Sequence, residues 1–87
     1  MLAAVLKGPR NLSVEEVPDP RSPPPGWVKL AIDTVGICGT DKAMYLGTYR
    51  PRKLPLIPGH EVAGRVDDVG PGVPAKLMGS LATTEIN

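Results

Sequence analysis

The stretch GICGTDKAMYLG, residues 36–47, holds the only cysteine of the chain, Cys38, and the stretch IPGHEVAG, residues 57–64, holds the only histidine, His60. Each stands in a glycine-framed polar segment, and Glu61 follows the histidine directly. Thiolate, imidazole and carboxylate are the three protein ligand types of zinc. The two stretches are therefore either turns of a small β domain or two halves of one metal site.

Residue spacing alone leaves this choice open. The chain has no Cys-x-x-Cys and no His-x-x-x-His. A lone cysteine in an apolar stretch is usually a small buried hydrophobe, and a lone histidine is more often a hydrogen-bonded bystander than a ligand.

The pattern around these stretches predicts a mainly β fold with one short helix, a small barrel or part of one. Thr40 or Asp41 can cap a helix over 40–46 that ends at Gly47. The five prolines of 18–26 predict a surface connection. Short apolar runs bounded by turn residues predict strands at 2–7, 12–17, 27–35 and 61–70. Gly8 and Pro9 suit a hairpin-like turn between the first two strands. In the third, the period of two puts Val28, Leu30 and Ile32 on one face.

Three single residues near these strands carry expectations of their own. Gly64, inside the 61–70 strand, predicts a bulge or a close backbone approach. Gly70 is interpreted as a plain turn residue. Trp27 is interpreted as an anchor that closes the sheet rather than as a substrate contact.

The composition and net charge of the chain argue against nucleic-acid and membrane partners. The 87 residues carry a net charge of +1, and the one basic cluster, Arg50, Arg52 and Lys53, is typical of a solvated loop rather than a nucleic-acid site. The apolar run before Lys7 is too short for a signal peptide or a membrane span. One cysteine excludes an internal disulfide and suits a reducing compartment, so we expect a cytoplasmic protein with no nucleic-acid or membrane partner.

The order of the motifs resembles a known family. Cys-Gly-Thr-Asp followed by Pro-Gly-His-Glu is similar to the zinc-dependent medium-chain alcohol dehydrogenases, which include sorbitol, threonine and glucose dehydrogenases. The resemblance covers residues 1–79 and implies that residues 1–87 are the N-terminal part of a GroES-like catalytic domain, a partial barrel. The histidine signature of that family is met at Gly59, His60, Glu61, Gly64, Gly70 and Val73.

The resemblance implies a role for each polar residue of the two stretches. Cys38 and His60 would bind the catalytic zinc, and Glu61 would be a ligand or a close neighbour that exchanges with substrate. Thr40 would accept the proton of the substrate alcohol, and Asp41 would orient the zinc-bound imidazole. The implied reaction is oxidation of a small alcohol by NAD or NADP, or reduction of an aldehyde or ketone in reverse.

The chain also departs from the family pattern. It has no G-x-G-x-x-G and no alternating strand and helix pattern, so the Rossmann nucleotide-binding domain is absent. The family's third zinc ligand is also absent, and Ala43 stands where some members carry a histidine. We therefore expect NAD or NADP to be used only by a full-length form, and the 87-residue chain to be inactive alone.

Two other interpretations remain. One is an enzyme of the same fold that works without zinc, as in the quinone reductase branch, whose members usually lack the counterparts of Cys38 and His60. The other is a non-enzymatic GroES-like β module that acts through assembly or partner binding. Open strand edges would then support a homo-oligomer.

Overall fold

The computed structural model describes residues 1–84 of the chain. It contains two compact units, each built from two segments. The first unit combines residues 1–19 with 37–59, and the second combines residues 20–36 with those from 60 onward.

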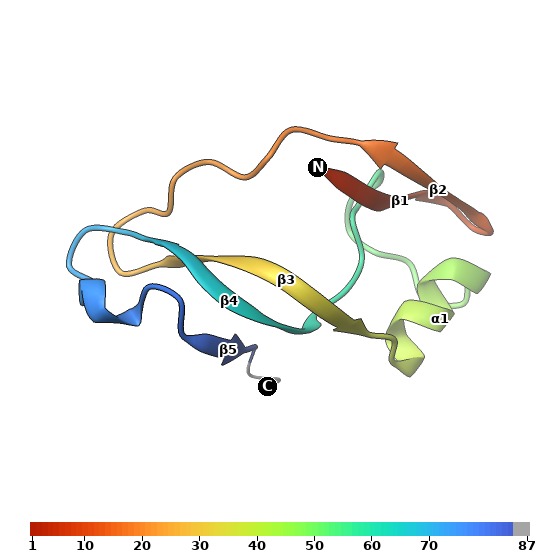
Figure 1. Cartoon of the computed structure of the whole chain (residues 1–87). Helices are drawn as coiled ribbons and strands as arrows, with labels where there is room; N and C mark the ends of the chain where they lie inside the picture. The colour runs from red at the N-terminus through yellow and green to blue at the C-terminus, as the bar shows by residue number, and fades with distance from the viewer. Residues whose placement is uncertain (85–87) are drawn as a thin grey trace. The chain divides into compact units, whose positions relative to one another are not determined.

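The first unit begins with an antiparallel hairpin of β1 (Leu2–Gly8) and β2 (Asn11–Glu16), as the sequence predicts (Figure 1). Arg10, in the tight connection, has the left-handed φ of 58°. Val5 and Leu6 of β1 are buried, and Leu6 exchanges two backbone hydrogen bonds with Leu56 at 2.8 and 2.9 Å. The segment after the helix is thereby fixed against β1.

The helix α1 (Gly39–Leu46) completes the first unit and ends at Gly47, as predicted. Its cap differs from the prediction, because Cys38 is the N-cap and Thr40 and Asp41 are already helical. The Cys38 N–H donates to Oδ2 of Asp41 at 3.0 Å, so Asp41 caps from inside the first turn. Gly47 has φ 86°, the left-handed conformation that commonly ends helices.

The second unit is a three-stranded antiparallel sheet in the order β3 (Val28–Gly36), β4 (Glu61–Val69) and β5 (Leu81–Thr83), drawn in Figure 1. β5 and the short 3₁₀ helix η1 (Ala75–Leu77) carry no clear sequence pattern and were not predicted. Val66, on the central strand, is the large apolar residue buried in this unit.

Two bulges interrupt the pairing of β3 with β4, at Lys29/Leu30 and at Ile32/Thr34. Gly64 pairs with Ile32 beside the second bulge, and a Cβ placed on Gly64 would lie 2.1 Å from the carbonyl oxygen of Ala31. The predicted close backbone approach at Gly64 is therefore confirmed. The extra residue of the first bulge is Asp67 of β4 and that of the second is Asp33 of β3, so the alternation of Val28, Leu30 and Ile32 is not interrupted. Their apolar face is not covered, since every residue of β3 is half-buried or exposed.

Two expectations at the start of the sheet are wrong. Trp27 is 67% exposed, so its indole does not anchor the sheet. Gly70 is more than a turn residue, because a Cβ there would lie 2.0 Å from the carbonyl oxygen of Pro24. The backbone anchors this end instead: Trp27 donates to Pro24 at 3.0 Å and accepts from Gly70 at 2.8 Å.

The architecture within residues 1–84 is mainly β, with open sheets and one short α-helix. The predicted fold class is confirmed.

Candidate metal centre

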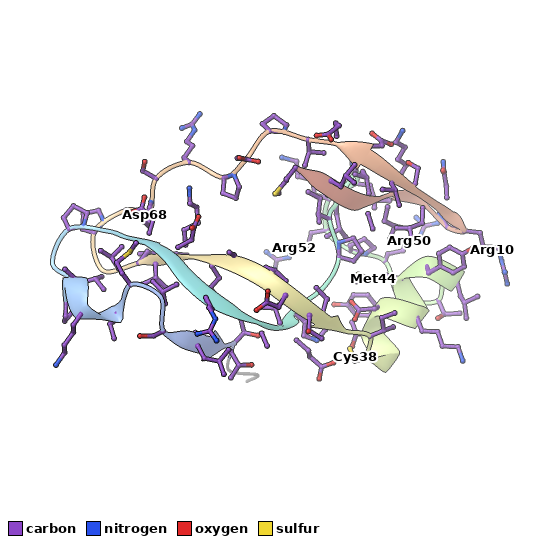
Figure 2. All side chains as sticks on the ribbon, in the orientation of Figure 1. Arg10, Cys38, Met44, Arg50, Arg52 and Asp68 are labelled. Atoms are coloured by element: carbon purple, nitrogen blue, oxygen red, sulfur yellow. The ribbon has the colours of Figure 1, made fainter. Side chains whose placement is uncertain are left out.

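Cys38 lies at the N-terminal end of α1, where Figure 2 labels it. Its backbone is extended, with φ −106° and ψ 177°, and its carbonyl accepts the first helical bond from the N–H of Lys42 at 3.2 Å. The side chain is half-buried and carries a thiol rather than a disulfide. Hydrogen bonds to both its N–H and its carbonyl hold the backbone of Cys38 at the start of the helix.

The other predicted residues of this stretch follow in the first turn of α1. Asp41 is half-buried and uses Oδ2 to accept the N–H of Cys38, so the carboxylate and the cysteine are held together. Thr40 is exposed. Glycine at position 39 does not relieve a clash, because a Cβ there would have no atom within 4 Å.

His60 and Glu61 stand at the start of β4 in the second unit. Glu61 is the first residue of that strand and pairs with Gly36, the last residue of β3. A Cβ on Gly36 would approach the Glu61 Cβ to 3.4 Å and Oε2 to 3.6 Å. Glycine at 36 therefore leaves room for the glutamate side chain at the end of the paired strands.

Thr83 and Thr84 hold the backbone of the histidine stretch. The Thr84 hydroxyl donates to the carbonyl of His60 at 2.6 Å and accepts the N–H of Val62 at 3.3 Å. The Thr83 hydroxyl donates to the carbonyl of Val62 at 2.8 Å. Neither threonine is predicted from the sequence, because no local motif connects them with a residue more than twenty positions earlier.

The register of β3 and β4 relates the two stretches along the chain. Gly36 and Glu61 are paired, Cys38 follows Gly36 by two residues, and His60 precedes Glu61 by one. Both stretches therefore join the same end of the β3–β4 pair. A thiol, an imidazole and a carboxylate are a donor set that fits zinc.

Within residues 1–84, no helix is long and apolar enough to cross a bilayer.

Comparison with known proteins decides the family. Residues 24–85 match the family model described as the alcohol dehydrogenase GroES-like domain. The chain belongs to this family. The match covers both stretches and most of the second unit, so the resemblance stated from the motifs is confirmed.

Individual relatives agree with the GroES-like assignment. "Probable zinc-binding alcohol dehydrogenase" of Mycobacterium tuberculosis is 38% identical over 81 residues, covering 93% of this chain and 21% of that protein. Sorbitol dehydrogenase 1 of Saccharomyces cerevisiae is 37% identical over 87 residues, covering 95% and 24%. The chain thus spans less than a quarter of the length of both relatives.

A solved structure shares the fold of this GroES-like chain. It is described as a short chain alcohol dehydrogenase from Escherichia coli CFT073 in complex with NADH. The similarity has a TM-score of 0.76 at 31% identity, and it covers 95% of this chain and 23% of that one.

Proposed function

We propose that this chain is the N-terminal, catalytic-zinc portion of an NAD(P)-dependent alcohol, polyol or sugar dehydrogenase. The observation that carries the proposal is the pairing of Gly36 with Glu61, which brings the cysteine and histidine stretches to one end of two strands. Membership of the alcohol dehydrogenase GroES-like family and the names of the zinc-binding and sorbitol relatives support it.

In this proposal Cys38 and His60 hold the zinc, and Glu61 is a further ligand or one that gives way to substrate. Bound zinc would supply Lewis acidity toward an alcohol oxygen. Asp41 would act on His60 by accepting a ring N–H, while its other role is to cap α1 through the N–H of Cys38. Thr40, exposed in the first turn, would accept the alcohol proton and pass it to solvent.

The rigid parts of the chain have separate tasks in this scheme. The capped start of α1 holds the backbone that carries Cys38, and the Thr84 hydroxyl holds the backbone that carries His60. Positioning by hydrogen-bonded backbone keeps metal ligands in place before the metal arrives.

The proposal gives the isolated 87-residue chain no binding site for the hydride acceptor. The 87 residues contain no dinucleotide-binding fingerprint, so NAD or NADP and a small alcohol, aldehyde or ketone would bind only to a full-length form. We expect the purified 87-residue chain to show no NAD(P)-dependent alcohol oxidation. Turnover above a buffer blank would contradict this part of the proposal.

Cobalt binding tests the ligand set directly. Titration of the purified protein with Co²⁺ should produce a thiolate-to-metal absorption band that is absent in Cys38→Ser and weakened in His60→Gln. Glu16→Gln, which removes an exposed carboxylate from the first unit, is the matched control and should leave the band unchanged. If the unmutated protein gives no band, these residues are not metal ligands in this chain.

A non-enzymatic β module that acts by assembly is the second candidate. The observation in its favour is exposed apolar surface, with Ile37 85% and Leu81 70% exposed. β3 and β5 are also the edges of their sheet within the described residues.

A further inference from the structure

A groove of about 420 Å³ lies in the first unit, apart from any residue assigned to the metal centre. Its walls are the end of β1 with the hairpin turn, the C-terminal half of α1, and the 49–54 segment. Three cationic residues line it, Lys7, Arg50 and Arg52, and no carboxylate does. Figure 2 labels Met44, Arg50 and Arg52 in this part of the chain.

Backbone hydrogen bonds hold the walls of this groove in place. The Arg10 N–H donates to the Tyr45 carbonyl at 2.6 Å, which ties the hairpin turn to the helix. The bonds between Leu6 and Leu56 tie β1 to the end of the 49–54 segment. Pro51 restricts the backbone between the two arginines. The groove is therefore formed before any ligand enters it.

Three carboxylates of the first unit form ion pairs with cations other than Arg50 and Arg52. Glu15 contacts Lys7 at 2.7 Å, so Lys7 is already partly neutralised. Glu16 and Asp19 lie 3.3 and 3.2 Å from the terminal amine. Within residues 1–84, neither arginine of the groove forms an ion pair.

The arginines are not required to stabilise the negative end of α1. The N–H groups of Gly47, Thr48 and Tyr49 all donate to the carbonyl of Ala43, and the Tyr45 carbonyl accepts from Arg10. The last turn thus has backbone donors for its carbonyl groups. Among the described residues, no carboxylate pairs with Arg50 or Arg52, so the two guanidinium groups leave a positive site in the groove.

We propose that this groove binds the phosphate group of a phosphorylated small molecule through Arg50 and Arg52. Guanidinium groups present a planar fork that matches two phosphate oxygens, and such charge-assisted bonds are the strong ones. The volume falls within the range of small-molecule sites. Met44, Pro51 and Leu54 add apolar wall against which a carbon skeleton packs.

The proposal revises the solvated-loop interpretation of the basic cluster. Two of its three members, Arg50 and Arg52, line the groove, whereas Lys53 does not. Lys53 is exposed and carries the same charge one residue away. It therefore supplies a matched control for the effect of charge without the geometry of the groove.

Chemical-shift titration of the ¹⁵N-labelled protein tests the proposal, with sorbitol 6-phosphate, inorganic phosphate and sorbitol as probes. Sorbitol 6-phosphate should bind saturably and shift amides of residues 47–54. Arg50→Gln and Arg52→Gln should each weaken binding about tenfold, whereas Lys53→Gln should change it less than twofold. Far-UV circular dichroism confirms that the variants remain folded, since all three side chains are exposed.

Each outcome bears on the proposal. Equal binding of inorganic phosphate identifies free phosphate as the ligand and supports the site, and tighter binding of the sugar phosphate supports a phosphorylated substrate. Equal weakening by Lys53→Gln, no saturation with either phosphate, or tighter binding of a DNA oligonucleotide through the same residues would overturn it. Because no metal is added, the result is independent of the cobalt experiment.

Discussion

Gly64 and Gly70 each permit a backbone approach that a side chain would block. A Cβ on either residue would lie 2.1 or 2.0 Å from a carbonyl oxygen of another segment. Neither glycine has a positive φ, so the requirement is space rather than backbone conformation. At both positions a missing methyl group determines how closely two segments approach.

Gly64→Ala should lower the free energy of unfolding by about 1–3 kcal/mol, because the methyl group meets backbone that has to shift. Urea denaturation measures the change. Gly39→Ala is the matched control, since its added Cβ has no atom within 4 Å, and it should be neutral or slightly stabilising in the helix. Equal effects of the two substitutions would show that the close approach to Ala31 does not affect the free energy of unfolding.

Glu15 gives a pH dependence at the residue scale. Hydrogen bonds from Lys7, and then from Ser13, hold the pKa of Glu15 below its ordinary value of 4.5. A depressed pKa in the folded state contributes stability above 4.5 that is lost as pH falls through the folded value. Glu15→Gln should therefore lower the melting temperature at pH 7, and the difference should disappear in acid.

Thermal unfolding at several pH values measures the Glu15 effect. Asp67→Asn, which removes an exposed carboxylate from the second unit, is the control for a change of charge away from Lys7 and Ser13. If Glu15→Gln lowers the melting temperature by the same amount below the folded pKa, the loss of stability comes from packing rather than from charge.

At the scale of elements, the short strand β5 determines the geometry of the histidine stretch. It pairs with β4 from Ala63 to Arg65, and the threonines at its end bond to the backbone of residues 60–62. A strand of three residues thus supports a segment with a proposed metal ligand.

Thr84→Val keeps the shape of the side chain and removes both hydroxyl bonds. We expect Co²⁺ affinity to fall about tenfold, because the carbonyl of His60 loses its donor and the segment gains freedom. Thr83→Val removes one bond to Val62 but none to His60, and it should leave the affinity within about twofold. Equal losses in the two variants would show that Thr84 has no special part in positioning the histidine.

The elements that the sequence predicted are those with local signals. The hairpin followed from two short strand candidates separated by Gly8 and Pro9, and the end of α1 followed from Gly47. β5 was missed because three residues are too few for a period, and the cap was misplaced because cysteine is rarely an N-cap. The candidate ligands were found from motif order, whereas their support by Thr84 required the sheet register.

At the scale of the whole molecule, the described chain exposes much apolar surface. Only Val5, Leu6 and Val66 are buried among its large apolar side chains, while Val14 is 72% and Leu81 70% exposed. Exposed apolar side chains favour association with another chain. Within the described residues β5 is also an edge strand, which presents unpaired backbone groups.

The 87-residue chain should therefore associate as its concentration rises, as measured by size-exclusion chromatography with light scattering. Leu81→Lys should shift the chain toward the monomer, because a charge on an edge strand opposes pairing. Ser22→Lys adds the same charge in the exposed connection before β3 and should have little effect. A monomer at every concentration would contradict this expectation and the assembly hypothesis together.

The candidate ligands, the hairpin, the helix end and the family resemblance could all be predicted from the sequence, because each depends on residues close together in the chain. Tertiary structure decided that Cys38 caps α1, that Thr84 supports His60, that Gly70 lies against Pro24 and that Arg50 and Arg52 share a groove. Contacts such as Thr84 with His60 join residues 24 positions apart, and only the register of the strands brings them together. That register depends on bulges and packing, which no local pattern of residues specifies.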